Sequence, residues 1–254
     1  MKQIRRILFF IFSAILLSSC ITSKSVQREM LKIQSELFYE LTTPVYSENI
    51  EKTIYLNPIG YSAILPFTTV KGKGGMIIPL IIYNLSQRKY ELTLGEASLI
   101  QPYRNFLMDA LLAQCNRSSC FDLVVNDGNI TLPDSALILD VKINGNATTT
   151  KMTYNDGAFF NPFESGYFTG FSNWVINSPT SWLDISVSLM QGEKSIWEKT
   201  YTATENLSYK RERIEDPHNA YENCIDAMTE NLSSTTKGVV ENISRDLHFF
   251  ILYK

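Results

Sequence analysis

Two stretches of alternating residues decide the fold: ALILDVKINGNAT (136–148) and WLDISVSL (182–189). In both, apolar residues such as Leu139 and Ile185 occupy every second position, and most residues between them are polar. Successive side chains of a strand point to opposite faces, so the pattern predicts two half-buried strands that share one core. The turn residues QGEK (191–194) then lead into a third strand-like segment, which predicts a hairpin.

Further strands are expected on the N-terminal side of these stretches. Residues 61–67 and 76–83 are apolar and rich in branched side chains, and the glycine-rich KGKGG (71–75) between them predicts a hairpin turn. A phosphate-binding loop would instead need a Gly-Lys-Ser/Thr ending and a following helix. Residues 90–94 and 121–125 are expected to add short strands.

Two helices complete the predicted core. The first covers residues 99–115, with Ser98 and Gln101 as a capping box. The second begins at Asp216, a good N-cap, followed by Pro217 at the first helical position. Short connections between the strands favour an α+β fold, a largely antiparallel sheet with two helices packed on one face.

A long aromatic segment interrupts this pattern. Residues 154–174 hold eight aromatic residues among 21, and glycine and proline residues break any regular element. The segment therefore predicts a long loop insertion of functional importance. The rings could complete the core, anchor a protein partner, or enter lipid. The residues expected to contact a partner or lipid are Phe159, Phe160, Phe163, Tyr167, Phe168, Phe171 and Trp174.

The N-terminus has the layout of a secretory signal. Basic residues precede an apolar run at 7–17, which is too short to span a bilayer, and small residues then lead to Cys20. The sequence LSSC (17–20) resembles the lipobox of bacterial lipoproteins. The resemblance implies that residues 1–19 are removed and that Cys20 carries the acyl chains that hold the protein on a membrane.

Charge limits the partners of the mature chain. Loss of the basic residues Lys2, Arg5 and Arg6 takes the formal net charge from −3 to −6. An acidic chain is poorly suited to bind nucleic acid, and an anionic membrane surface would not attract it. Acylated Cys20 is therefore the expected contact with membrane lipid.

Residues 20–50 are expected to be a lipidated tether and residues 51–254 a single α+β domain. Within the tether, apolar residues at steps of three and four predict a short amphipathic helix, which packs on its own domain or on a partner. Its apolar positions are Val26, Met30, Ile33, Leu37 and Leu41. Pro44 would end it.

The remaining cysteines allow two interpretations. Cys115 and Cys120 enclose a turn-like tetrapeptide, and an exported protein permits a disulfide between them. Alternatively, both could join Cys224 and His218 in a zinc site, although nothing in the sequence brings the two pairs together. We expect no metal and no cofactor.

The sequence does not predict an enzyme. It has two histidines, His218 and His248, and no Gly-x-Ser-x-Gly motif for a nucleophile. The order of elements, carried by residues 103–112, 137–143 and 183–189 and by the last helix, resembles two groups of outer-membrane lipoproteins. These are the auxiliary lipoproteins of ABC-type lipid transporters and the lipoprotein partner of the lipopolysaccharide-insertion barrel.

The resemblance implies a non-enzymatic subunit or adaptor of an envelope lipid-transport or outer-membrane assembly machine, with an envelope protein as partner. Ile21, rather than an aspartate, follows the lipidated cysteine. In enteric-type sorting this resembles an outer-membrane signal, and we expect the protein to face the periplasm. The alternatives are a lipid-binding module and a structural envelope protein that contacts peptidoglycan or a secretion channel.

Overall fold

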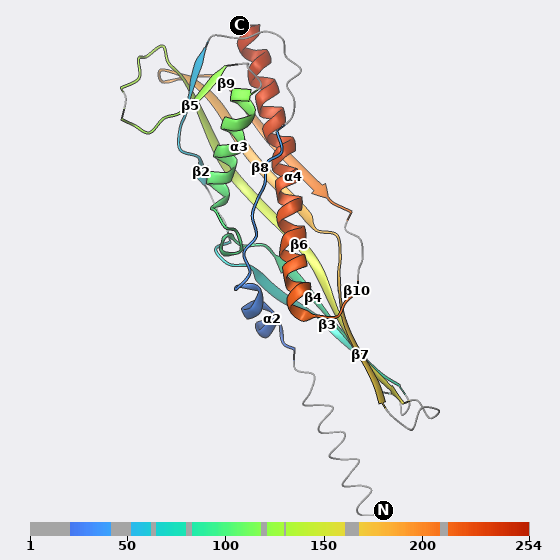
Figure 1. Cartoon of the computed structure of the whole chain (residues 1–254). Helices are drawn as coiled ribbons and strands as arrows, with labels where there is room; N and C mark the ends of the chain where they lie inside the picture. Colours follow the sequence, from blue (N-terminus) through green and yellow to red (C-terminus); the bar gives the residue numbers. More distant parts are fainter. Residues whose placement is uncertain are drawn as a thin grey trace, which may run out of the picture.

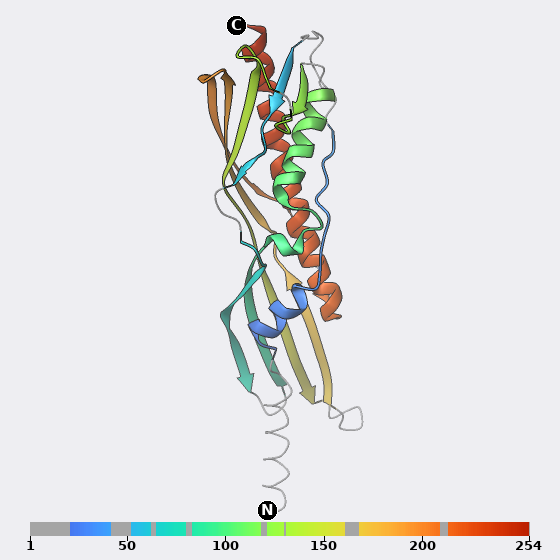
Figure 2. The same cartoon turned by 90° about the vertical axis from the view of Figure 1, so that its left-hand side faces the viewer.

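The structure is a computed structural model in which the strands form one sheet with helices on one face (Figures 1 and 2). It describes residues 21–41, 52–61, 65–79, 83–117, 121–129, 131–160, 168–208 and 213–253. The molecule is elongated, with the C-terminal end of the last helix at one end and strand ends at the other (Figure 1).

Strand β6 (Leu137–Phe160) is a long central strand with which most other strands of the sheet pair. Its first half pairs with β8 in antiparallel fashion on one side and with β1 and β2 in parallel on the other. We call this half the upper sheet. Its other strands are β1 (Thr53–Leu56), β2 (Gly60–Tyr61), β5 (Asp122–Val125), β8 (Thr180–Gln191) and β9 (Lys194–Asn206).

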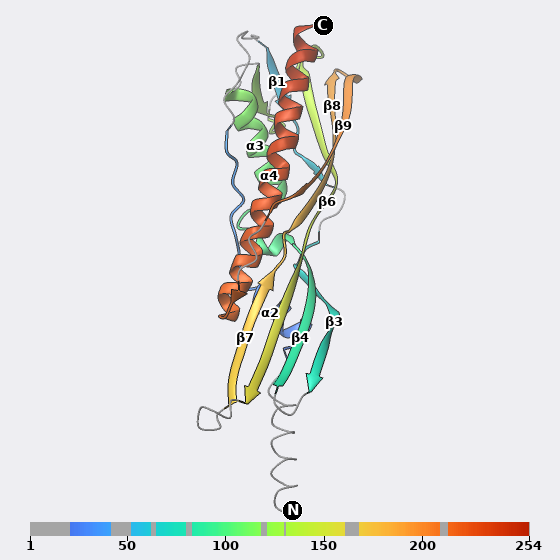
Figure 3. The same ribbon diagram turned by 90° about the vertical axis from the view of Figure 1, so that its right-hand side faces the viewer.

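The second half of β6, from about residue 149, belongs to a different set of strands, which we call the lower sheet. Here β4 pairs on one side and β7 on the other, all antiparallel, and these strands project beyond the helices (Figure 3). Its other strands are β3 (Thr69–Pro79), β4 (Tyr83–Thr93), β7 (Phe168–Ile176) and β10 (Arg213–Ile214).

Within the described ranges, three α-helices and a short 3-10 helix cover one face. They are α2 (Ser23–Met30), η1 (Glu96–Ser98), α3 (Tyr103–Arg117) and α4 (Pro217–Leu252). The predicted start of α4 is confirmed, because the Asp216 side chain accepts from the Asn219 backbone N–H and Pro217 occupies the first turn. None of the helices in the described ranges is long and apolar enough to cross a membrane.

The predicted fold class is confirmed as α+β, but the sheet is mixed and three helices accompany it. Strand β1 lies between β5 and β6 and is parallel to both. Most strand pairs are antiparallel, as predicted, but the sheet is not strictly antiparallel, and the expectation of two helices was wrong. Parallel strand pairs join segments that are remote in the chain, so no local turn sequence predicts them.

The described parts of the aromatic segment are paired strands, where a loop insertion was expected. Residues up to Phe160 continue β6, and β7 returns beside it, with Gly157 opposite Phe171 and Ala158 opposite Gly170. The two glycines that were expected to break regular structure therefore lie in paired strands. Residues 161–167 lie outside the described residues.

The glycine-rich segment was also misassigned. KGKGG lies inside β3, whose register against β4 shifts between Gly72 and Gly75, as in a β-bulge. A Cβ atom at Gly75 would stand 2.3 Å from the Gln87 carbonyl oxygen, so only glycine fits this close approach. Of the strand predicted at 61–67, only Tyr61 lies in a described strand, β2.

The helical periodicity at residues 26–41 holds only to Met30. Beyond it the chain is extended and runs along α3 and α4, where the Tyr39 hydroxyl donates to Gln114 Oε1 at 2.9 Å. Ile33 and Leu37 are buried there without being helical. The expected capping box of the next helix is likewise absent, because α3 begins at Tyr103, whose N–H donates to Glu96 Oε1.

Candidate functional site

The two faces of the lower sheet differ in what covers them. Residues of β4 at even positions, such as Tyr90 and Leu92, face the helices and are buried. Their neighbours at odd positions, such as Gln87 and Lys89, face the opposite side, which we call the open face. The site has therefore two parts, a clamp on the helix side and a polar row on the open face.

The clamp holds the chain immediately after the predicted lipidation site. Arg88 Nη1 donates to the Ile21 carbonyl oxygen at 2.8 Å, and the Tyr90 hydroxyl donates to the same oxygen at 2.9 Å. The two side chains point the same way because they are two residues apart on one strand. Burial raises the pKa of Tyr90, so its hydroxyl keeps the proton that it donates.

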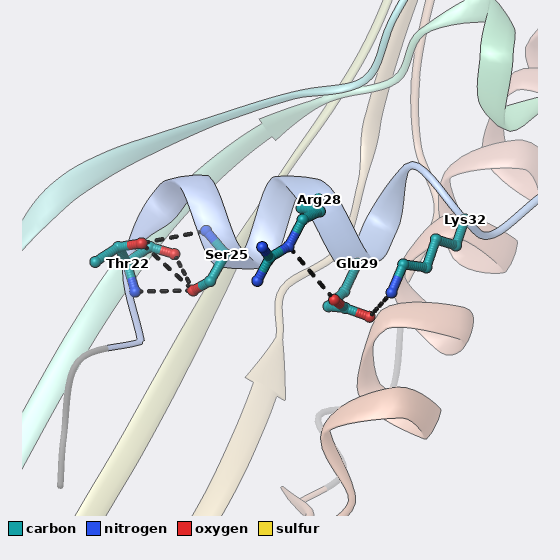
Figure 4. Close-up of polar contacts among 5 residues, drawn as sticks. All are labelled: Thr22, Ser25, Arg28, Glu29 and Lys32. Carbon is teal, nitrogen blue, oxygen red and sulfur yellow. Dashed lines mark hydrogen bonds and ion pairs between the residues drawn. The ribbon is translucent and has the colours of Figure 1, made fainter.

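Helix α2 continues this attachment. Thr22 caps it through a reciprocal pair of bonds with Ser25, and Glu29 forms an ion pair with Lys32 at 2.7 Å (Figure 4). On its inner side Val26 and Met30 are fully buried, and the helix packs against β3 and α4. The chain is thus fixed to the body from Ile21 onwards.

An aromatic cluster lies on the same side of the lower sheet. The Trp174 ring lies 4.6 Å from Tyr154, 5.2 Å from Tyr221 and 6.0 Å from Tyr90, measured between ring centroids. Trp174 is fully buried, and among the described residues its indole N–H has no hydrogen-bond partner. This position excludes Trp174 from contact with a partner, so for this residue the sequence-based expectation was wrong.

The open face carries a row of amide side chains across three strands. Gln87 Nε2 donates to Asn155 Oδ1 at 3.0 Å, and Asn155 Nδ2 donates to Asn173 Oδ1 at 3.1 Å. Within the described part of the chain, this leaves the side-chain oxygen of Gln87 (Oε1) and the side-chain N–H groups of Asn173 (Nδ2) without protein partners. The row therefore offers an acceptor at one end and donors at the other.

Apolar and charged residues surround the amide row. A depression of about 790 Å³ includes Leu85, Phe171 and Val175 beside the amides, and Phe171 is 36% exposed. A second depression, of about 610 Å³, is bordered by lysines and by Glu91. Lys73 forms an ion pair with Glu91, which holds the pKa of that carboxyl below its usual range. Aromatic residues are enriched in protein-contact surfaces and lysine and glutamate are depleted there, so exposed Phe171 is the feature of this face that favours protein contact.

The other predicted site residues are placed as follows. Phe159 and Phe160 end β6 and Phe168 begins β7, so these three lie at the far end of the lower sheet. Four predicted site residues lie outside the described residues: Cys20, Phe163, Tyr167 and Cys120. The predicted disulfide between Cys115 and Cys120 therefore also lies outside them. Cys115 itself is buried in α3.

The positions of His218 and Cys224 bear on the alternative prediction of a zinc site. His218 is exposed and contacts Glu222, whereas Cys224 is fully buried in the core. No group of three or more metal-binding side chains gathers within the ranges that the structure describes.

Sequence reasoning missed the clamp and the amide row. The alternating pattern of SQRKYEL (86–92) was available as a signal, since it places Arg88 and Tyr90 on one face and Gln87 on the other. The sequence pattern does not say which face of this strand contacts Ile21, because that contact joins segments 67 residues apart.

Comparisons with known proteins give only distant likenesses. No protein-family model matches the chain, and no curated protein matches it. Protein XCC0632 from Xanthomonas campestris, of family DUF330, is similar over 83% of this chain and 91% of its own, with a TM-score of 0.43 and 9% identity. A hemagglutinin homologue from Helicobacter pylori, described as neuraminyllactose-binding, covers 84% and 92%, with a TM-score of 0.38 and 12% identity. Neither likeness assigns a function to this chain.

Proposed function

We propose that this protein is a non-enzymatic lipoprotein that serves as a subunit or adaptor of an envelope lipid-transport or outer-membrane assembly machine. Acylated Cys20 anchors it in the outer membrane, where it faces the periplasm. Its open face docks a protein partner that lies at or in the same membrane.

One observation carries this proposal. The residue after Cys20 is clamped to one side of the lower sheet by Arg88 and Tyr90, while no described helix packs on the other side, which bears the amide row. An anchor on one side and a partly exposed polar row on the other would hold a docking surface beside the membrane. Exposed Phe171 supplies an aromatic anchor of the kind that dominates binding energy.

The lipid-binding alternative is less well supported. The space lined by Leu94, Leu99, Tyr103 and Leu232 has a volume of about 20 Å³, whereas a pocket for a ligand of ordinary size needs about 300 Å³ or more. A larger depression of about 430 Å³ lies between the upper sheet and the end of α4, where Leu137 and Phe250 line it. Polar side chains such as Lys52 and Gln191 share that lining, which favours an acyl chain less than an apolar pocket would.

Photo-crosslinking in cells tests the adaptor role. A photoreactive residue at Phe171 or Met76, both exposed on the lower sheet, should crosslink to one envelope protein. Phe249, which is 44% exposed near the C-terminal end of α4, is the control position and should not. Equal capture at all three positions, or crosslinks within the chain only, would contradict the proposal.

A pair of matched variants tests the amide row itself. Asn155→Ala removes its centre, whereas Asn144→Ala removes an amide on the same strand in the upper sheet, where it bonds Asp184 and Ser186. We expect only Asn155→Ala to reduce the crosslink yield at Phe171. An equal effect of both variants would argue against docking at this row.

A further inference from the structure

The upper sheet carries an exposed tryptophan on the side away from the helices. On β8, Leu183, Ile185 and Val187 are buried beneath α4, so the residues between them face the opposite side. We call that side of β6, β8 and β9 in the upper sheet the outer face, which the described helices do not cover (Figures 2 and 3). Trp182 lies on the outer face and is 40% exposed.

The backbone next to this ring is shaped to receive it. The register of β6 against β8 shifts between Ile143 and Gly145, as in a β-bulge. A Cβ atom at Gly145 would stand 2.7 Å from Cζ3 and 2.8 Å from Cη2 of Trp182, so only glycine allows the indole to lie there. The ring therefore leans across β6 and is exposed on the side away from that strand.

Polar side chains surround the ring. Asn144 Nδ2 donates to Asp184 Oδ1 at 3.2 Å, and Asp184 Oδ2 has no hydrogen-bond partner among the described residues. The register places Thr204 opposite Trp182 and Thr202 opposite Asp184, and both threonines are exposed. The ring is thus bordered by a carboxylate that accepts hydrogen bonds and by hydroxyls that both donate and accept.

The charge of the outer face selects against anions. Its charged side chains on β6, β8 and β9 are Asp140, Asp184, Glu198 and Lys142, three acids and one base. Like charges brought together cost free energy, so a ligand with phosphate or carboxylate groups is disfavoured here. An uncharged ligand that is rich in hydroxyl groups matches the surface.

We infer that the outer face binds a chain of uncharged sugars at Trp182. A pyranose ring has a face of C–H groups and a rim of hydroxyl groups. The C–H face packs on the indole, and the hydroxyls bond to Asp184, Thr202 and Thr204. Hydrogen bonds to the charged carboxylate of Asp184 are the strongest of these polar contacts.

A sugar fits this surface better than a protein partner does. Aromatic anchors of protein interfaces are surrounded by further contacts that exclude water. The nearest outer-face neighbours of Trp182 are instead polar or small, namely Thr180, Asp184, Thr202, Thr204 and Ala147. An amphipathic ligand with polar edges satisfies both the ring and these neighbours.

The inference goes beyond the adaptor role, because it adds a ligand and a second site. Ala147, which pairs with Trp182, is eight residues along β6 from Asn155 of the amide row. Eight residues of a strand span about 27 Å, so a sugar at Trp182 does not cover the amide row. A protein partner and a sugar chain can therefore be held at the same time.

Isothermal titration calorimetry tests the inference with the full-length protein, purified in a detergent whose headgroup carries no sugar. The neutral probes are cellotetraose, maltotetraose and tetra-N-acetylchitotetraose, and trigalacturonate is the anionic probe. We expect at least one neutral probe to bind with a Kd below about 1 mM and trigalacturonate to bind at least about ten-fold more weakly. Absence of binding by every neutral probe at about 5 mM, or tighter binding of trigalacturonate, would overturn the inference.

Three variants test the assignment to this surface. Trp182→Ala should weaken binding at least about ten-fold, and Asp184→Asn, which keeps the shape of the side chain, at least about three-fold. Phe249→Ala removes a ring that is 44% exposed on α4 and should leave the Kd within about two-fold. If Trp182→Ala does not fold, Asp184→Asn decides the test. Unchanged binding by Asp184→Asn, together with unchanged binding by any folded Trp182→Ala, would overturn the assignment.

Failure of this inference can be separated from failure of the proposed function. Crosslinking from Phe171 tests the adaptor role, and sugar binding tests the site at Trp182. A photoreactive residue at Thr204, opposite Trp182, distinguishes the two kinds of partner in cells. Capture of an envelope protein at Thr204 by a protein that binds no sugar would make the ring a protein contact and would overturn the sugar site alone.

Discussion

At the scale of single residues, the carbonyl of Ile21 links the predicted anchor to the sheet. Two donors on one strand meet one acceptor, and both donor side chains come from a segment that looks like an ordinary amphipathic strand. A buried hydrogen bond contributes about 1 kcal/mol net to stability. Removal of one hydroxyl should therefore weaken the clamp without unfolding the protein, which makes the contribution of the clamp measurable.

Tyr90→Phe keeps the ring in the aromatic cluster and removes only the hydroxyl that bonds Ile21. We expect the free energy of unfolding to fall by about 1 kcal/mol and the amides of α2 to lose protection from hydrogen exchange. Tyr253→Phe, at an 83% exposed position, is the control and should change neither. Undiminished protection of α2 in Tyr90→Phe would show that the bond does not hold the chain.

Trp174 and Phe171 are three residues apart but belong to different environments. Trp174→Ala empties a fully buried site and should cost about 3–5 kcal/mol, measured by denaturant unfolding. Phe171→Ala, at a partly exposed position, should cost less than about 1 kcal/mol. Comparable losses would mean that Phe171 serves the core and is not a contact residue.

Burial raises the pKa of the Cys224 thiol to about 12. In the unfolded chain a thiol ionises near pH 8.5, so between about pH 8.5 and 12 only the unfolded state loses the proton, and stability falls as pH rises. In a chain that starts at Ile21 and carries Cys115→Ala and Cys120→Ala, Cys224 is the remaining thiol, and it should therefore not react with Ellman's reagent at pH 8 until the protein is denatured. Rapid reaction in the native state would contradict this burial.

At the scale of elements, the hairpins of the lower sheet show why glycine content misled the sequence-based prediction. Glycine and proline are good turn signals, but glycine also serves where two backbones approach closely. Gly75 beside the Gln87 carbonyl is such a case, and Gly157 and Gly170 lie in neighbouring positions of two paired strands. Of the aromatic residues between them, Phe159, Phe160 and Phe168 lie in these paired strands.

Two substitutions in β3 separate these roles of glycine. Gly75→Ala would place a Cβ 2.3 Å from a backbone oxygen, whereas Gly72→Ala finds open space. We expect Gly75→Ala to lower the free energy of unfolding by more than about 1 kcal/mol and Gly72→Ala to stay within about 0.5 kcal/mol. Thermal unfolding of both variants measures the difference, and similar melting temperatures would argue against the bulge.

At the scale of the whole molecule, the N-terminal segment is part of the body. The side chains of Val26, Met30, Ile33 and Leu37 are all buried in the same core as the sheet and α4. Residues 33–41 also bond to α3 and α4 through Phe38 and Tyr39. The clamp and the lower sheet that carries the open face therefore form one continuous structure with the helices.

A chain that starts at Lys52 should accordingly be much less stable than one that starts at Ile21. Loss of four buried apolar side chains removes roughly 1.5–3 kcal/mol each, against a total stability of about 5–15 kcal/mol. Expression of both chains without the lipid anchor, followed by thermal unfolding, measures the effect. Equal melting temperatures would show that residues 21–41 are a dispensable tether.

The sequence by itself determined the features that depend on neighbouring residues. The alternation at 136–148 and 182–189 and the Asp216–Pro217 start of α4 are local patterns, and the structure has strands and a helix there. Only the tertiary structure decided the parallel pairing of β1, the extended path of residues 33–41 and the hairpin of aromatic residues. The hydrogen bonds from Arg88 and Tyr90 to the Ile21 carbonyl oxygen were likewise decided by the tertiary structure alone. These features depend on contacts between remote segments, and periodicity within one segment carries no information about which remote segment lies opposite.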